Sequence, residues 1–352
     1  MVDHLARIER YVTTVEDGDR LPTNPRVSVC IRTYNHEKFI AGAIEGALMQ
    51  EADFSYEVII AEDRSTDGTR KIVRDYQRRY PDKIRLRLAE ENLYSKNKRY
   101  PTLGAWNAAR GEYIARCDGD DYWTDPKKLQ KQADFLDDHP DCTICFTAAE
   151  ILNDKSGEVE GTQEPDEIRE TYSLEYVLRR SAFYFSTSTA LHRDDICNKI
   201  PSWFYIGIAG DFSLLVLCTR EGDVGYIDKK CATYRKHEGG VHSPLDTLEK
   251  FDLAVETREA VFPILDSYHR RILGAKIYSF NRRALRIAMN QAGTSKVRKY
   301  AQRCWRWLGH SNRKYIDVPL VILLMFYYPV MGPVLRSMRN WKKKFADVLG
   351  VG

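Results

Sequence analysis

Short apolar segments alternate with amphipathic ones through residues 27–115, and this alternation leaves few folds open to the chain. The apolar segments have the length and composition of buried strands. They are Val27–Ile31, Tyr56–Ile60, Ile84–Leu88 and Gly111–Ala115. Helices are expected between them, over Glu37–Gln50, from Asp67 to about Tyr80, and around Leu103–Ala109. Because strands that alternate with helices form a mainly parallel sheet with helices on both faces, the sequence predicts an α/β fold.

Polar side chains follow three of these predicted strands at the point where each strand ends. Thr33, Tyr34 and Asn35 follow the first strand, Asp63 follows the second, and an acidic run at 118–121 follows the fourth. Ligands of parallel α/β sheets bind outside the carboxyl ends of the strands. We therefore expect these three clusters to line one binding site.

The acidic run is Asp118-Gly119-Asp120-Asp121, in which three carboxylates occupy four positions. Carboxylates this close repel one another unless a cation lies near them. Their oxygens suit hard divalent ions such as Mg²⁺ or Mn²⁺, whose coordination substrate phosphates often complete. The run thus predicts a divalent-metal site, although a solvated acidic turn would have the same local composition.

The middle of the chain continues the α/β pattern. Residues 153–170 are polar and predict a loop or hairpin, and Ser186–Leu191 has the composition of a strand. A helix is expected from Gly210 to about Arg220. Short strands are expected at Gly225–Ile227 and Cys231–Tyr234.

These patterns divide the chain into three parts. Residues 1–25 are predicted to be an N-terminal extension, and residues 26–244 the α/β domain that carries the polar clusters. Residues 245–352 are predicted to be a helical C-terminal region of more basic composition. A length of 352 residues agrees with about two domains.

The last part contains an apolar segment that suits contact with a membrane. Val318–Leu335 has no charged residue, and Arg336 and further basic residues follow it. A helix of this length covers ~27 Å, slightly less than a ~30 Å hydrocarbon core. Three prolines interrupt it, which disfavours an ordinary core helix. We expect residues 316–336 to make a peripheral or monotopic contact with an anionic cytoplasmic membrane face, the alternatives being a packed helix or an oligomer contact.

The overall composition excludes some classes of function and location. A net charge of +4 gives no support to nucleic-acid binding. The eight cysteines are scattered and several lie in apolar runs, which is typical of free thiols in a reducing compartment. The N-terminus is polar and shows no secretory signal, so a cytoplasmic location is expected.

Taken together, three segments resemble the signature blocks of family-2 glycosyltransferases. They are Ser28–Asn35, Glu62–Thr69 and Gly111–Asp121, in the order and spacing of that family. The resemblance covers roughly Arg26–Ser243 and is closest to enzymes that build bacterial surface polysaccharides. It implies the GT-A (Rossmann-like) fold and an inverting, metal-dependent transfer of a sugar from a nucleotide-diphosphate donor.

The resemblance also implies roles for individual residues. Asp211 matches the catalytic base, although Gly210 stands where the family usually has an acidic residue. Asp121 matches the metal ligand, and Asp118 and His237 are further candidates. The residues matched to donor or nucleotide contacts are Thr33, Tyr34, Asn35, Asp63, Asp120, Arg235 and His237. An alternative for Asp211 is a helix N-cap alone.

Together these roles describe the steps of one sugar-transfer reaction. A Mn²⁺ or Mg²⁺ ion would offset the charge that develops on the diphosphate leaving group. Asp211 would accept the proton of the acceptor hydroxyl. Asp63 would accept the N3–H of uracil or thymine, which predicts UDP- or dTDP-sugars as donors. The expected acceptor is a glycan or a polyprenyl-linked glycan.

Two other functions remain open at this point. A sugar nucleotidyltransferase would carry a glycine-rich basic loop after the first strand, and residues 33–36 contain no glycine. A non-catalytic glycan-binding or scaffold protein on the same fold would have no need for Asp63, Asp121 and Asp211, so their presence argues against it.

Overall fold

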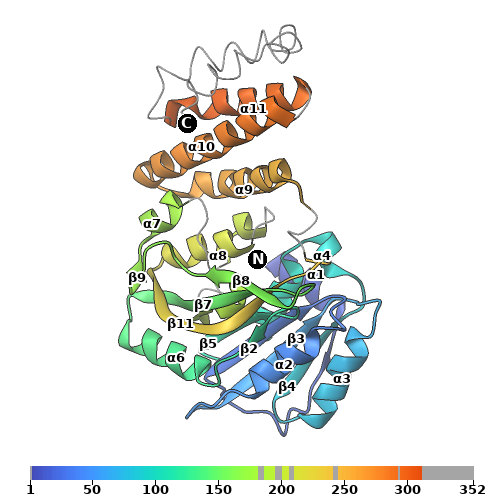
Figure 1. Ribbon diagram of the computed structural model, residues 1–352. Helices are drawn as coiled ribbons and strands as arrows, with labels where there is room; N and C mark the ends of the chain where they lie inside the picture. Colours follow the sequence, from blue (N-terminus) through green and yellow to red (C-terminus); the bar gives the residue numbers. More distant parts are fainter. Residues whose placement is uncertain are drawn as a thin grey trace. The chain divides into compact units, whose positions relative to one another are not determined.

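The computed structural model describes residues 2–180, 186–194, 200–205, 210–240, 245–291 and 294–310. The chain forms two compact units (Figure 1). The first, here the sheet unit, contains residues 1–177 and 182–244. The second, the helical unit, contains residues 178–181 and 245–352. The apolar segment expected at 316–336 lies outside the described residues.

The sheet unit is built on one mixed sheet, in which a parallel core is extended by antiparallel strands. The core strands are β2 (Val27–Thr33), β3 (Tyr56–Glu62), β4 (Ile84–Ala89) and β5 (Tyr113–Asp118). They are parallel in the order β4-β3-β2-β5. Almost every residue of these strands is buried, which is why they appear in the sequence as continuous apolar runs.

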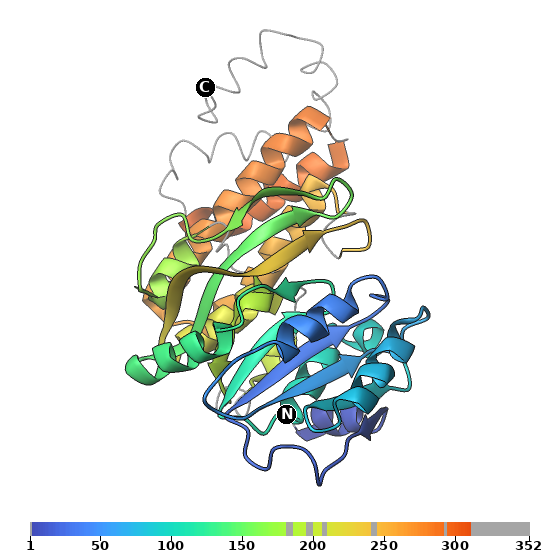
Figure 2. The same ribbon diagram turned by 60° about the horizontal axis from the view of Figure 1, so that its bottom comes forward.

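The remaining strands extend this core on both sides. They are β1 (Val12–Val15), β6 (Tyr122–Trp123), β7 (Cys142–Asn153), β8 (Glu158–Gln163), β9 (Thr171–Tyr172), β10 (Leu191–Arg193) and β11 (Asp223–Lys236). The order along the sheet is β1-β4-β3-β2-β5-β10-β7-β11-β6, with β8 beside β7 and β9 beside β11. β7 and β11 run parallel along most of their length (Figure 2).

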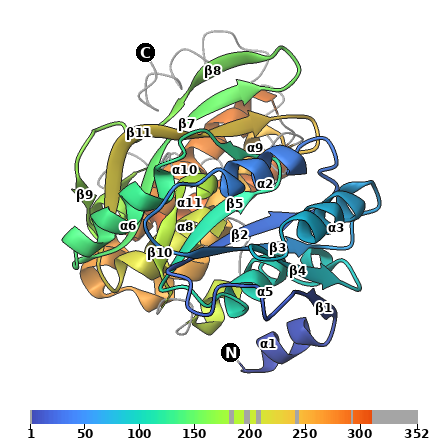
Figure 3. The same cartoon turned by 90° about the horizontal axis from the view of Figure 1, so that it is seen from below.

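Helices pack on both faces of the sheet. Up to residue 219 they are α1 (Val2–Glu9), α2 (Ile40–Leu48), α3 (Thr69–Arg79), α4 (Leu93–Lys96), α5 (Tyr100–Asn107), α6 (Lys128–Asp138), α7 (Leu174–Arg179) and α8 (Gly210–Thr219). α6 and α8 pack on the outer strands β7 and β11. α2 and α3 pack together on one face, and α5 packs on the other with α1 beside it (Figure 3). The predicted α/β architecture is confirmed, and it places the carboxyl ends of β2, β3 and β5 at one edge.

Residues 2–15, which the sequence places in an N-terminal extension, join the sheet unit. β1 pairs antiparallel with the outer core strand β4. Arg87 on β4 donates hydrogen bonds to Glu9 of α1 and to Thr14 of β1. This segment therefore covers a strand edge that would otherwise expose unpaired backbone groups.

Two predictions of local structure differ from what is observed. Ser186–Leu191 is not a strand over its first part, because Thr187–Thr189 form a 3₁₀ turn, η1, and β10 starts at Leu191. Ser186 Oγ accepts the backbone N–H of Ser188, a local bond that competes with strand pairing. The two short strands expected at residues 225–234 are one strand, β11, with an irregularity between Ile227 and Ala232. The hairpin expected within 153–170 is confirmed by the pairing of β7 with β8.

The helical unit contains three long helices. They are α9 (Thr247–Val261), α10 (Ser267–Gln291) and α11 (Thr294–Trp307). α9 begins with a capping box in which Asp246 and Glu249 bond each other's backbone N–H groups. α10 packs against both α9 and α11. Among the described residues, no helix combines the length and the apolar character that crossing a membrane requires.

Candidate active site

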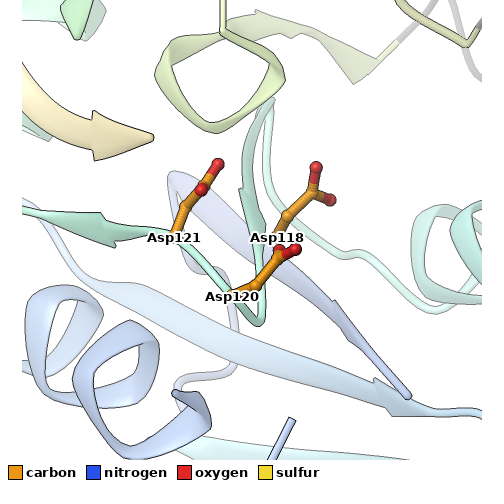
Figure 4. A group of neighbouring side chains, drawn as sticks. All are labelled: Asp118, Asp120 and Asp121. Carbon is orange, nitrogen blue, oxygen red and sulfur yellow. The ribbon is translucent and has the colours of Figure 1, made fainter. Parts of the chain in front are cut away.

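Three carboxylates meet in the turn that joins β5 to β6. Asp118 is the last residue of β5, and Asp120 and Asp121 follow it directly. One oxygen from each lies within 4.8 Å of an oxygen from the others, and the three side chains point to the same side of the turn (Figure 4). The predicted clustering of these carboxylates is therefore present in the fold.

Asp121 is the most deeply held of the three, with only 2% of its surface exposed. Ser188 Oγ donates to its Oδ2 at 2.6 Å, and the backbone N–H of Arg235 donates to its Oδ1 at 3.0 Å. Burial, together with repulsion from Asp120 and Asp118, raises the pKa of Asp121 well above its ordinary value. A nearby cation would relieve this repulsion.

Asp120 is more accessible and faces two histidines. His237 Nε2 lies 3.1 Å from Asp120 Oδ2, and His36 Nε2 lies 3.8 Å from the same oxygen. Burial opposes ionisation of Asp120, but the hydrogen bond from His237 and the charge of His36 keep its pKa below the ordinary value. The surroundings of Asp120 thus favour its ionised form.

Asp118 is compensated by Arg32 of β2, which reaches both of its oxygens. The Nη2–Oδ2 distance is 3.0 Å. The backbone N–H of Asp118 donates to Ser188 Oγ at 3.1 Å, so Ser188 connects Asp118 to Asp121. Arg32 therefore balances the charge of Asp118, whereas the surrounding residues offset the charges of Asp120 and Asp121 only in part.

The residues of this turn fit a hard divalent ion. Three carboxylate oxygens lie close enough to share one cation, and His237 is beside them. Thr33 Oγ1 and His36 Nδ1 are buried nearby and form no hydrogen bond with any described residue. A Cβ on Gly119 would lie 2.8 Å from the first and 2.9 Å from the second. Glycine at this position therefore lets the acidic turn approach the end of β2.

The loop after β2 is fixed by the loop after β3. Asn35 has a left-handed backbone with φ of 54°, which asparagine tolerates better than most residues. Its Oδ1 accepts the backbone N–H of Thr66 at 2.8 Å, and its own N–H donates to Ser65 Oγ at 3.0 Å. Tyr34 is 41% exposed beside it. This arrangement holds residues 33–35 at the sheet edge, as the sequence predicts.

Asp63 lies at the same edge but is bonded by the chain itself. Its Oδ1 accepts the N–H of Leu93 at 2.7 Å, and its Oδ2 accepts the N–H of Tyr94 at 3.0 Å. Burial raises the pKa of Asp63 to about 6, although these two backbone donors oppose the shift. The carboxylate therefore tethers the start of α4 to the end of β3.

Asp211 lies in the first turn of α8 and accepts a hydrogen bond from Thr187 Oγ1. Thr187 and Ser188 are consecutive residues of η1, and Ser188 bonds Asp121. One short turn thus connects the expected base to the acidic turn. This connection is not visible in the sequence, because residues 186–191 have the composition of a strand and the carboxylates that Thr187 and Ser188 bond are distant in the chain.

The glycine before Asp211 makes room for an arginine. A Cβ on Gly210 would lie 2.6 Å from Arg99 Nη1. Arg99 is buried and donates to the backbone oxygen of Phe204 and to Ser213 Oγ, each at 3.2 Å. Burial lowers the pKa of Arg99 to about 10, while the charge of Asp211 acts in the opposite direction. The Arg99 guanidinium thus occupies the space beside Gly210 that an acidic side chain at this position would enter.

Arg235 and His237 are brought to the acidic turn by the end of β11. The Arg235 guanidinium lies 4.4 Å from the ring centre of Tyr122 and 5.3 Å from that of Phe39. Next to His237 is a cavity of about 440 Å³, lined by the loop after β2, the β7–β8 turn and residues 237–239. Its volume falls in the range of small-molecule sites.

Comparison with known proteins gives one family match. Residues 28–200 match the family described as "Glycosyl transferase family 2". An uncharacterised protein of Mycobacterium tuberculosis is 34% identical over 232 residues, which cover 64% of this chain and 63% of that protein. The chain thus spans less than two thirds of the length of this curated relative.

Two solved structures share the fold. The Staphylococcus aureus TarS fragment 1–349 in complex with UDP-GlcNAc has a TM-score of 0.63 at 19% identity, covering 93% of this chain and 92% of that one. The mannosyltransferase PcManGT from Pyrobaculum calidifontis, in complex with GDP-Man and Mn²⁺, has a TM-score of 0.53 at 16% identity and covers 97% and 95%. These likenesses extend over the sheet and the C-terminal helices.

Proposed function

Because the chain belongs to glycosyltransferase family 2 and has the GT-A fold, we propose that it transfers a sugar from a nucleotide-diphosphate donor to a glycan acceptor. The observation that carries this proposal is the link through η1. Thr187 bonds Asp211, the expected base, and Ser188 bonds Asp121 in the acidic turn. The consecutive residues Thr187 and Ser188 thus hold a group able to accept a proton and one carboxylate of the proposed donor site.

The donor would lie along the edge of the sheet. Thr33, Tyr34 and Asn35 would line the nucleotide, and Asp63 would accept the N3–H of its base. UDP-sugars are the first choice, and dTDP-sugars share the same N3–H. The UDP-GlcNAc bound to TarS supports this choice, since that protein has the same fold.

The diphosphate and sugar would lie at the acidic turn. Asp120, Arg235 and His237 would contact them, because all three lie together there. Asp121 with Asp120 would hold a Mn²⁺ or Mg²⁺ ion, with Asp118 and His237 as further ligands. The bound ion would offset the negative charge of the leaving diphosphate. The Mn²⁺ in PcManGT supports this assignment.

The acceptor hydroxyl would lose its proton to Asp211. The hydrogen bond from Thr187 orients this carboxylate, and attack from the face opposite the diphosphate would invert the anomeric carbon. The acceptor is a glycan or a polyprenyl-linked glycan at the cytoplasmic membrane face. Contact of residues 316–336 with the membrane would bring the enzyme there.

The direct test is hydrolysis of donors in the absence of acceptor. Purified full-length protein is incubated with UDP-, dTDP- and GDP-sugars and Mn²⁺, and release of the nucleoside diphosphate is followed. We expect release of UDP or dTDP that stops when the metal is chelated, and loss of that release in Asp120→Asn. Asp82→Asn, an exposed acid on the surface, is the matched control. No release from any donor would favour a non-catalytic glycan-binding protein.

A further inference from the structure

The C-terminal part of the chain carries a strong excess of positive charge. Residues 245–352 contain 20 lysines and arginines and 8 acidic residues, whereas residues 1–244 contain 34 and 42. The net charge of +4 therefore conceals a C-terminal part near +12 and an acidic remainder near −8. Such an asymmetry indicates an anionic partner for the basic part.

Within the helical unit, this charge is concentrated in α10 and α11. Together the two helices contain 11 lysines and arginines and no aspartate or glutamate. The acidic residues of the described part lie on α9 and in the segments that precede α9 and α10. The two helices therefore cannot neutralise their charge between themselves.

α9 compensates only one side of α11. Asp252 of α9 accepts from Lys299 Nζ at 2.7 Å and from Arg303 Nη1 at 2.6 Å. Five further arginines of the two helices are exposed and form no ion pair with any described residue. They are Arg271, Arg283, Arg286, Arg298 and Arg306. These five exposed cations are therefore left without a compensating acid among the described residues.

Exposed aromatic rings accompany these arginines. Trp305 is 48% exposed on α11, and Tyr268 is 45% exposed on α10. Arg298 and Trp305 are seven residues apart, two helical turns, so their side chains share one side of α11, and Arg306 is exposed next to that side. Amphipathic rings among arginines are typical of surfaces that meet lipid headgroups.

We propose that the exposed sides of α10 and α11 form a docking surface for the anionic headgroups of a lipid bilayer. Arginine binds phosphate oxygens in a bidentate manner, and an indole ring suits the boundary between headgroups and acyl chains. The same unit contains the uncharged sequence Val318–Leu335, which favours a bilayer over a soluble anionic polymer as the partner. A basic surface and an apolar segment in the same chain supply the two signals that stable attachment requires. This inference concerns location and does not depend on the transfer reaction.

The test is the partition of the full-length protein onto vesicles. Vesicles of phosphatidylcholine with 30 mol% phosphatidylglycerol are compared with vesicles of pure phosphatidylcholine by flotation; a composition of roughly this kind gives a negative surface potential. We expect stronger binding to the anionic vesicles, weakened by high salt. The variant Arg283→Gln, Arg286→Gln and Arg298→Gln should lower the partition coefficient roughly 100-fold, since each arginine contributes about five-fold.

A matched variant on α3 separates position from charge. Lys71→Gln, Arg74→Gln and Arg78→Gln remove the same charge from another exposed helix and should leave binding within about two-fold. Thermal unfolding of both variants checks their folding, and donor hydrolysis should be the same in both. Trp305→Phe should remove a blue shift of tryptophan fluorescence on binding. Equal binding to neutral and anionic vesicles overturns the proposal, as does binding of soluble polyglutamate but not of vesicles.

Discussion

The carboxyl ends of β3 and β5 lie at the same edge of the sheet, and both carry acids, but the chain treats these acids differently. After β3, Asp63 receives two backbone hydrogen bonds from Leu93 and Tyr94. After β5, three carboxylates lie together, and only Asp118 has an arginine that reaches both of its oxygens. The carboxylate after β3 thus has its hydrogen-bond donors within the fold, whereas the carboxylates after β5 lack enough positive charge around them.

This difference distinguishes two kinds of acidic residue that look alike in a sequence. Asp63 contributes to the structure even without a ligand, because its removal would free two backbone donors. The acidic turn gains from a cation, because burial and mutual repulsion disfavour its charge. Substitutions at each of the two strand ends test this difference. The first substitution is at Asp211, which η1 connects to the acidic turn.

The largest effect is expected for Asp211→Asn. Because the amide cannot accept the proton of the acceptor hydroxyl, kcat for transfer should fall by roughly 10²–10⁴. Binding of UDP with Mn²⁺ should remain unchanged, since Asp211 is linked to the acidic turn only through η1. Thermal unfolding should show an intact fold. A fall of less than about five-fold would leave Asp211 with only a structural role in the first turn of α8.

The acidic turn should respond next. Asp120→Asn should lower activity by about 10²–10³, which is the scale of one lost electrostatic contact at a developing charge. It should also abolish the rise in melting temperature that Mn²⁺ causes in the parent protein. Asp63→Asn should retain that metal response. If both variants lose it equally, the proposed difference between the two strand ends is wrong.

The free energy of unfolding should depend on pH through Asp63, the acid after β3. The pKa of Asp63 is about 6 in the folded chain, above the ordinary 3.8, so the native protein holds this proton more strongly. Its contribution to stability is therefore largest below about pH 4 and is lost as the pH rises through 6. Asp63→Asn should remove about 2–3 kcal/mol of this dependence between pH 4 and 7, measured by urea unfolding. Asp82→Asn should leave the profile unaltered, and an unaltered profile in Asp63→Asn would contradict the assignment.

The smallest effect is expected at Gly210, the residue before Asp211. Gly210→Ala places a methyl group 2.6 Å from Arg99 Nη1, which should cost about 1–3 kcal/mol of stability. The cost should shrink in an Arg99→Lys background, where the guanidinium is absent. Gly161→Ala, which meets nothing within 4 Å, is the control. Equal costs at the two glycines would show that Arg99 does not occupy this space.

The sequence predicted the parallel core well, for a physical reason. The strands β2–β5 are buried on both faces, so each is a continuous apolar run, and the polar clusters mark where each strand ends. The clustering of Asp118, Asp120 and Asp121 is equally local, since they lie within four positions of one turn. These features depend on neighbours in the chain and are therefore visible without a structure.

The features that the sequence did not reveal depend on distant partners. Ser188 meets Asp121 across 67 positions, and Arg99 fills the space beside Gly210 from the segment that precedes α5. Asp63 is held by backbone N–H groups, which have no signature in the side-chain sequence. The sequence predicts a strand where η1 lies, because serine and threonine bond their own backbone in ways that apolar patterning does not show.

We expect the acidic turn to bind the donor diphosphate only when it holds a cation. Isothermal titration of UDP into the full-length protein, with and without Mn²⁺, tests it most directly. We predict that Mn²⁺ raises the affinity of the parent protein for UDP at least ten-fold. The same increase is expected for Asp63→Asn, when its affinity with Mn²⁺ is compared with its own affinity without metal. In Asp120→Asn the metal should make no difference. An affinity for UDP that is the same with and without Mn²⁺ in the parent protein would contradict the account.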